Sequence, residues 1–257
     1  VAIHCEDPQA VVANRRHLGK ADWIAANDVA AWRHYRKLLR DAGDEKRARQ
    51  VILWNPLGLS PAAADLARAE AKPVADREWD VCVLGYPYPS RAATAREFLK
   101  AAPTTWRVLL VGDGWGKEVA GFARKGVETR ETLPENETVR ALCRSKIAFL
   151  SHRKQGDIGG FPLVAPESIH RGFLEATCGC IPRIDADRGF GLGRGRAARW
   201  TDGRGAAKRV FELLKDTPRL AEMSAWNSSH AAEWSMEARM RRVLHAVRTE
   251  LYEAWVP

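Results

Sequence analysis

Short apolar runs alternate along the chain with longer stretches of helical spacing, a pattern typical of α/β proteins built around a parallel sheet. The apolar runs predict strands at residues 1–5, 23–26, 51–54, 79–85, 107–111, 147–151 and 181–184. The longer stretches predict helices at residues 27–42, 60–71, 90–101, 117–125, 135–143 and 167–178, with further helices from residue 218 onward. We therefore expect an α/β fold with a doubly wound parallel sheet.

Local signals mark helix starts and a candidate domain boundary. Ser60-Pro61 combines an N-cap residue with a first-turn proline, and Ser90 is expected to cap the helix that follows it. Residues 72–78 are polar with one proline and form a candidate linker. We expect a doubly wound domain at residues 76–257, and residues 1–75 read as the end of another domain.

Composition places the chain among ordinary globular proteins, with 257 residues, 46% apolar and 28% charged. No apolar run approaches the ~18 residues that span a bilayer, and the sequence does not open on a secretion signal. Its five irregularly spaced cysteines, including Cys178-x-Cys180 without a second Cys/His pair, argue against a disulfide scaffold and a zinc site. We expect a soluble, cytoplasmic protein without a metal centre.

The formal net charge of +9 bears on partners rather than on fold. Eight Lys or Arg residues against two acidic ones lie between Arg188 and Lys215, and Arg194, Arg196 and Arg204 are interspersed there with six glycines. A Gly/Arg loop can present backbone N–H and guanidinium groups to phosphate. A solvated loop that binds no ligand is an equally weighted alternative to this phosphate-binding interpretation.

Several familiar catalytic signatures are absent from the sequence. It contains no P-loop, no G-x-S-x-G elbow, no H-E-x-x-H and no protein-kinase set. The segment Gly112-Asp113-Gly114-Trp115-Gly116 follows a strand, but its spacing differs from a dinucleotide-binding fingerprint, so we interpret it as a strand-to-helix turn. Hydrolase, metalloprotease and kinase activities lose their usual support.

The predicted helix at 167–178 carries the most informative polar residues. At ~100° per residue, Glu167, Arg171 and Glu175 lie within ~80° of one face, and the two glutamates are ~12 Å apart along the axis. That separation is close to the span between the sugar ring and the ribose of an extended nucleotide sugar. Arg171 and the helix N-terminus suit the pyrophosphate between them. The alternative is an exposed i, i+4 ladder of salt bridges.

Glu167 and Glu175, followed by Ala176 and Gly179-x-Ile181-Pro182, resemble the E-x7-E signature of GT-B glycosyltransferases. The wider pattern is similar to the glycosyltransferases related to the spore-maturation protein CgeB. The other segments that carry this resemblance are Glu6-Asp7-Pro8, Ala21-Asp22, Trp79-Asp80-Val81 with Gly85, Pro89 and Arg91, Ser145-Lys146-Ile147, and Arg171-x-Phe173-x-Glu175. The resemblance implies a Rossmann-like donor-binding domain at residues 76–257, ending in helices that cross back to a partial or reduced acceptor-side region at residues 1–75.

The resemblance also implies roles for individual residues. Glu167 would contact hydroxyls of the donor sugar and Glu175 the ribose, while Arg171 and Arg91 would neutralise the departing diphosphate. Gly85, after its strand, would let the backbone approach the phosphates. Such enzymes usually need no metal, and the expected donor is a UDP-sugar.

The sequence departs from the family pattern at three places, and one of them is the loop after Ile184, which is richer in glycine and arginine than is usual in the family. Ser168-Ile169-His170 replaces the usual Gly-Phe-Gly, so His170 is either a donor contact or a surface histidine. The region before residue 76 is also short for an acceptor domain. Within it, Glu6 or Asp7 follows a predicted strand and is the candidate acceptor-side base, with an Asp/Pro turn as the alternative.

We predict a glycosyltransferase that moves a sugar from a nucleotide-sugar donor to an acceptor hydroxyl. The basic charge would suit a polyanionic acceptor such as hydroxymethylated DNA, with cell-wall glycans, proteins or small metabolites as open alternatives. The second hypothesis is a non-catalytic, basic Rossmann-like module that binds nucleotides or nucleic acid. The donor sugar, the stereochemical outcome and the oligomeric state are left open by the residues.

Overall fold

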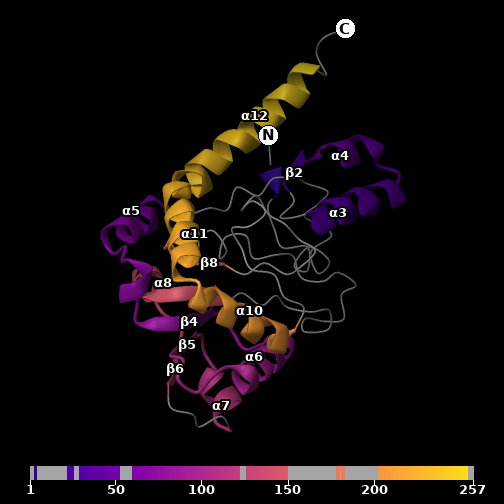
Figure 1. Ribbon diagram of the computed structural model, residues 1–257. Helices are drawn as coiled ribbons and strands as arrows, with labels where there is room; N and C mark the ends of the chain where they lie inside the picture. Colours follow the sequence, from indigo (N-terminus) through magenta and orange to yellow (C-terminus); the bar gives the residue numbers. More distant parts are fainter. Residues whose placement is uncertain are drawn as a thin grey trace.

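Two parallel sheets organise the chain (Figure 1). The computed structural model describes residues 3–4, 22–25, 29–52, 60–121, 126–149, 178–179, 181–182 and 202–253. A three-stranded sheet has the order β1-β2-β3, and a five-stranded sheet has the order β6-β5-β4-β7-β8. The strands are β1 (Ile3–His4), β2 (Trp23–Ala25), β3 (Val51–Ile52), β4 (Trp79–Leu84), β5 (Val108–Val111), β6 (Val127–Arg130), β7 (Ser145–Phe149) and β8 (Ile181–Pro182). Every neighbouring pair is parallel, which confirms the expected α/β class with parallel sheets.

The helices follow the strands in the alternation that the apolar pattern predicts. They are α3 (Val29–Asp41), α4 (Glu45–Arg49), α5 (Pro61–Ala69), α6 (Pro89–Ala101), α7 (Trp115–Val119), α8 (Glu135–Cys143), α10 (Gly203–Lys215), α11 (Thr217–Ser229) and α12 (Met236–Glu253), with 3-10 turns η1 (Val74–Asp76) and η2 (Ala231–Trp234). The predicted start of α5 is confirmed, because the Ser60 hydroxyl accepts a hydrogen bond from the Ala63 N–H at 3.1 Å and Pro61 opens the helix.

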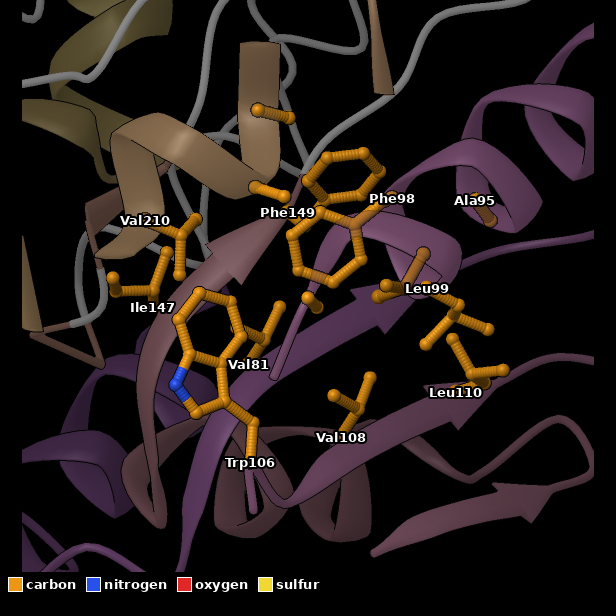
Figure 2. Close-up of a cluster of buried hydrophobic side chains, with 14 of the residues drawn as sticks. Val81, Ala95, Phe98, Leu99, Trp106, Val108, Leu110, Ile147, Phe149 and Val210 are labelled. Atoms are coloured by element: carbon orange, nitrogen blue, oxygen red, sulfur yellow. The ribbon is translucent and has the colours of Figure 1, made fainter. Parts of the chain in front are cut away.

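The five-stranded sheet is buried on both faces. Alternate residues of β4 point to opposite sides: Val81 and Val83 pack with α6 and α10, while Cys82 and Leu84 pack with α5 and α8. In Figure 2 the Phe98 ring of α6 lies against Phe149 of β7, with ring centroids 4.9 Å apart. Helices on both faces of a parallel sheet define the doubly wound arrangement, which the structure confirms.

Helix α10 is an element that the sequence analysis missed. Its first residues, Gly203 and Gly205, fall in the expected Gly/Arg loop, whose Arg194 and Arg196 lie outside the described residues. Asp202 caps the helix by accepting from the Gly205 N–H at 2.7 Å. Gly203 lies so close to α6 that a Cβ there would be 2.3 Å from the Thr94 carbonyl oxygen. The glycine that lowers helix propensity is therefore what lets α10 pack on α6.

Two other predictions of local structure were wrong. Helix α6 has Tyr88 as its N-cap and Pro89 at its first position, so Ser90 is not the cap. The proline, which favours the first helical turn, starts the helix earlier than the hydroxyl signal suggested. Strand β6 was not predicted, because it is an edge strand whose sequence Val-Glu-Thr-Arg is only partly buried and has no apolar run.

The three-stranded sheet is also covered on two sides. Ile24 of β2 packs with Tyr35 of α3, whereas the preceding residue, Trp23, packs with Val243 and Val247 of α12. The C-terminal helix thus contacts strands near the start of the chain, and Figure 1 shows α12 running toward β2. Helix α5, which belongs to the first part of the chain, contacts the five-stranded sheet, because its Ala63 and Ala67 pack on one face of that sheet. Both contacts cross the division at residues 75 and 76, which stays a prediction.

Candidate functional site

The strand order locates a candidate ligand site at one edge of the five-stranded sheet. From β4, the chain adds β5 and β6 on one side, and β7 and β8 lie on the other side. The order therefore reverses between β4 and β7, and open α/β sheets bind ligands outside the carboxyl ends of the strands at such a point. Gly85 follows β4 directly at this position.

Two glycines meet at this edge. The Gly85 N–H donates to the Val111 carbonyl at 2.8 Å, and the Gly112 N–H donates to the Arg130 carbonyl at 2.9 Å, so pairing continues past the strand ends. Gly85 has φ +102° and Gly112 has φ +138°, conformations that favour glycine. A Cβ on Gly112 would lie 2.8 Å from both the carbonyl carbon and oxygen of Gly85. The edge can be this tight only because neither residue has a side chain.

Trp115 fixes the carbonyl of Gly85. Its indole Nε1 donates to that oxygen at 2.8 Å, and the side chain is almost fully buried. Trp115 opens α7 directly after the Gly112-Asp113-Gly114 turn, which is the strand-to-helix turn expected from the sequence. The turn was predicted, but its support of Gly85 was not, because that contact joins residues 30 positions apart.

Replacing Trp115 with phenylalanine should destabilise the protein by about 1–2 kcal/mol. The substitution keeps an aromatic ring but leaves the part-buried Gly85 carbonyl without this donor. Urea unfolding followed by circular dichroism would measure the change. An unchanged free energy of unfolding would show that this hydrogen bond does not hold the turn.

The loop from Gly85 into α6 is held by Arg91. Its Nη1 donates to the Tyr86 carbonyl at 2.5 Å, and its guanidinium carbon lies 5.5 Å from the centroid of the Tyr88 ring. Arg91 is only 5% exposed, whereas Tyr86 is 48% exposed. The structure thus places Arg91 in the packing of this loop, and its contact with a diphosphate stays a prediction.

The N-terminus of α6 points its backbone toward the same edge. The helix has 13 residues, opens with Pro89, and has no side-chain hydrogen bond at its N-cap. Its dipole places partial positive charge beside the Gly85 loop, where an anion would be stabilised. The glycine contact, the loop and the helix end together form a surface suited to a phosphate group.

The remaining predicted site residues lie outside the described residues: Glu6, Asp7, Glu167, His170, Arg171 and Glu175. The segment 167–175 falls in the sequence between β7 and β8, the strands on one side of the reversal in strand order. Of the predicted site residues, Gly85 and Arg91 lie within the described ranges. They flank the loop that joins β4 to α6, at the candidate site.

Two segments of the family resemblance meet at the opposite edge of the sheet. Lys146 Nζ lies 2.8 Å from Asp80 Oδ1, and the other carboxylate oxygen of Asp80 accepts from the Arg107 N–H at 2.9 Å. These contacts join the starts of β4, β5 and β7, at the amino ends of the strands. Asp80 and Lys146 therefore serve packing of the strands rather than the candidate site.

Within the described ranges, no three His, Cys, Asp or Glu side chains are grouped so as to hold a metal ion. The same ranges contain no helix of the length and apolarity required to cross a membrane.

No protein-family model matches the chain. No curated protein matches it either. Solved structures do: Anabaena HepE in complex with UDP and glucose superposes with a TM-score of 0.60 at 13% identity, covering 89% of this chain and 64% of HepE. Sucrose-phosphate synthase from Thermosynechococcus elongatus superposes with a TM-score of 0.62 at 13% identity, and the match covers 97% of this chain and 63% of the synthase.

An α-glucosyltransferase in complex with UDP-glucose and DNA containing an abasic site gives a TM-score of 0.62 at 11% identity, covering 96% of this chain and 71% of that one. These structures are GT-B glycosyltransferases. The chain has a GT-B fold. At these identities the likeness concerns the fold alone, and the chain spans about 64% of the length of HepE.

Proposed function

We propose that this chain belongs to a glycosyltransferase that binds a nucleotide-sugar donor at the carboxyl edge of β4 and β7. The observation that carries the proposal is the close contact of Gly85 and Gly112 beside the α6 N-terminus, at the reversal of strand order in a GT-B fold. That arrangement suits a diphosphate, which is the charged part of such a donor.

The donor we propose is a UDP-sugar. The HepE structures contain UDP or UDP-glucose, and so do the α-glucosyltransferase structures. In this chain the diphosphate would lie against the Gly85 loop, with Glu175 on the ribose and Glu167 on the sugar. Arg91 would position the loop, because its guanidinium is bound to the Tyr86 carbonyl.

The reaction moves the sugar from the diphosphate to an acceptor hydroxyl. The bond between the anomeric carbon and the diphosphate oxygen breaks, a bond from that carbon to the acceptor oxygen forms, and the acceptor proton goes to a base. We propose Glu6 or Asp7 as that base. Arg171, His170 and the α6 N-terminus would stabilise the departing diphosphate, so no metal is required.

The acceptor we propose is a polyanion such as hydroxymethylated DNA. The net charge of +9 supports this choice, and one structure of similar fold is in complex with DNA. A non-catalytic nucleotide-binding module is the less favoured alternative, because the structures of similar fold are those of sugar-transferring enzymes.

The direct test incubates the protein with a panel of nucleotide sugars and measures release of nucleoside diphosphate, with and without hydroxymethylated DNA. We expect release with one donor, and a glycosylated product detected by mass spectrometry. Donor binding without release under any condition would favour the non-catalytic module. Release that DNA does not stimulate would remove DNA as the acceptor.

Replacing Glu167 with alanine should lower kcat/KM for the donor about 10- to 100-fold. The carboxylate would accept hydrogen bonds from sugar hydroxyls, and bonds to a charged group contribute about 1.5–3 kcal/mol. Glu222→Ala, an exposed substitution on α11, is the matched control and should change kcat/KM less than about twofold. Equal activity of Glu167→Ala and the control would contradict the role of Glu167.

A further inference from the structure

Helix α3, beside the three-stranded sheet, carries a row of basic side chains. Arg33, Arg36, Lys37 and Arg40 lie within about 100° of one another around the helix at ~100° per residue. Three of the four, Arg33, Lys37 and Arg40, are exposed. We call these four residues the α3 basic stripe. From Val29 to Arg49 the chain has seven Lys or Arg residues against three acidic ones, so the surrounding field is positive.

The carboxylates next to the stripe neutralise it only in part. Lys37 Nζ lies 2.6 Å from Asp41, and Arg40 Nε lies 3.2 Å from Glu45. Both pairs are exposed, and such pairs contribute little and exchange readily with other anions. Arg33 is exposed and forms no ion pair with an acidic residue of the described ranges.

Arg36 also lacks a carboxylate among the residues that the structure describes. Its guanidinium carbon lies 4.4 Å from the centroid of the Trp32 ring, and its buried Nε has no hydrogen-bond partner there. Five arginines of other helices differ in this respect. Each of Arg68, Arg96, Arg140, Arg209 and Arg241 forms an ion pair with a carboxylate. Within the part of the chain that the structure describes, Arg33 and Arg36 thus differ from these five paired arginines.

The stripe is attached to the acceptor-side sheet. Trp32 Nε1 donates to the Val51 carbonyl of β3 at 2.9 Å, and Tyr35 and Leu39 are buried against the strands. Helix α3 follows β2, and β2 is parallel to β1, so the stripe starts from the edge at which β1 ends. Glu6 and Asp7, the proposed acceptor-side bases, follow β1 in the sequence.

We propose that the α3 basic stripe binds backbone phosphates of a DNA acceptor; this rests on the proposed function, in which DNA is the acceptor and Glu6 or Asp7 is the acceptor-side base. From Arg33 to Arg40 the helix rises ~10.5 Å at ~1.5 Å per residue. Phosphates of one DNA strand rise ~3.4 Å each along the axis and are farther apart along the winding strand, so side chains at the two ends of the stripe can reach neighbouring phosphates. Contacts of this kind position the duplex, and they do not select its sequence.

The test measures binding of the full chain to a short fluorescein-labelled DNA duplex by fluorescence anisotropy, between about 50 and 200 mM salt. The triple variant Arg33→Gln, Arg36→Gln, Lys37→Gln should raise Kd at least tenfold at the low salt concentration. It should also make the slope of the log association constant against log salt less negative by about 2.7, because each lost phosphate contact removes about 0.9 from its magnitude. Arg33→Gln alone, which breaks no ion pair within the described ranges, should make this slope less negative by about 0.9.

The matched control removes the same charge from α12, by Arg241→Gln, Arg242→Gln, Arg248→Gln. All three residues are exposed. Equal losses of affinity in the stripe and control variants would overturn the proposal, because net charge alone would then explain binding. An unchanged slope in Arg33→Gln and in the triple variant would also overturn it.

Donor turnover without DNA separates this inference from the proposed function. We expect the stripe variants to release nucleoside diphosphate as the wild type does. A wild type that turns over donor but shows no stripe-dependent DNA binding would refute the stripe alone. A wild type that binds DNA through the stripe but turns over no donor would refute the proposed function alone.

Discussion

Replacing Arg77 with methionine should destabilise the protein by about 4 kcal/mol. Arg77 is 6% exposed, and its guanidinium group donates to the carbonyl oxygens of Ser145 at 3.0 Å and Gly179 at 2.9 Å. It also donates to the Ser224 hydroxyl at 2.9 Å and the Lys72 carbonyl at 3.1 Å. Methionine would fill similar space but leave the buried acceptors of Ser145, Gly179 and Ser224 without this donor, and each unpaired buried group costs about 1–3 kcal/mol.

Urea unfolding followed by tryptophan fluorescence would measure the loss. Arg68→Met is the matched control: Arg68 has a 74% exposed side chain paired with Asp65, so we expect a change within about 0.5 kcal/mol. Ser224→Ala removes one of the four acceptors and should cost about 1 kcal/mol. A cost for Arg77→Met no larger than that of the control would mean that the four hydrogen bonds do not stabilise the fold.

Arg77→Lys keeps the charge but replaces the planar fork of donors with one nitrogen. We therefore expect an intermediate loss of about 2 kcal/mol and a folded protein. Arg77 holds Gly179, which follows the segment 167–178, so a folded Lys variant should also bind donor more weakly. Unchanged donor affinity in that variant would limit Arg77 to a role in stability.

Replacing Gly112 with alanine should cost about 3 kcal/mol or more. Its φ of +138° is unfavourable for a residue with a side chain, and the new Cβ would lie 2.8 Å from the backbone of Gly85. Backbone atoms cannot rotate away as a flexible side chain can, so one of the two turns must move. Because Gly85 lies at the candidate site, we expect donor affinity to fall as well as stability.

Gly116→Ala is the matched control for Gly112→Ala. Gly116 lies in α7, and an added Cβ would meet only the Thr129 hydroxyl, at 3.9 Å. Alanine there should be neutral or stabilise the protein by up to about 1 kcal/mol, because it favours helix. Thermal unfolding of both variants would compare them. Equal melting temperatures would contradict the proposed steric contact between Gly112 and Gly85.

Several features that depend only on neighbouring residues were predicted correctly, although the cap at Ser90 was not. The cap at Ser60 and the proline at Pro61 were predicted because both act within one helical turn. The short buried strands were found because residues such as Val81 and Cys82 are apolar on both faces of a covered sheet. An exposed edge strand such as β6 has no such signal, and it was missed.

The candidate site was predicted only in part for the same reason. Gly85 was selected from the family resemblance, as the last residue of the predicted strand 79–85, and the structure places it directly after β4 at the reversal of strand order. Gly112 and Trp115 were visible in the sequence as parts of a turn. Their contacts with Gly85 join separate βα units, so nothing in the local spacing indicates them.

By itself, the sequence determined the alternation of strands and helices, the basic charge and the residue types available for a donor site. Those properties follow from apolar periodicity and composition, which act over a few residues. Only the tertiary structure decided that Arg77 joins Gly179 and Ser224, which are 102 and 147 positions away, and that Gly203 lets α10 pack on α6. The hydrogen bonds of a buried guanidinium and the space around a glycine depend on which distant segments fold against it, and that is a property of packing rather than of local pattern.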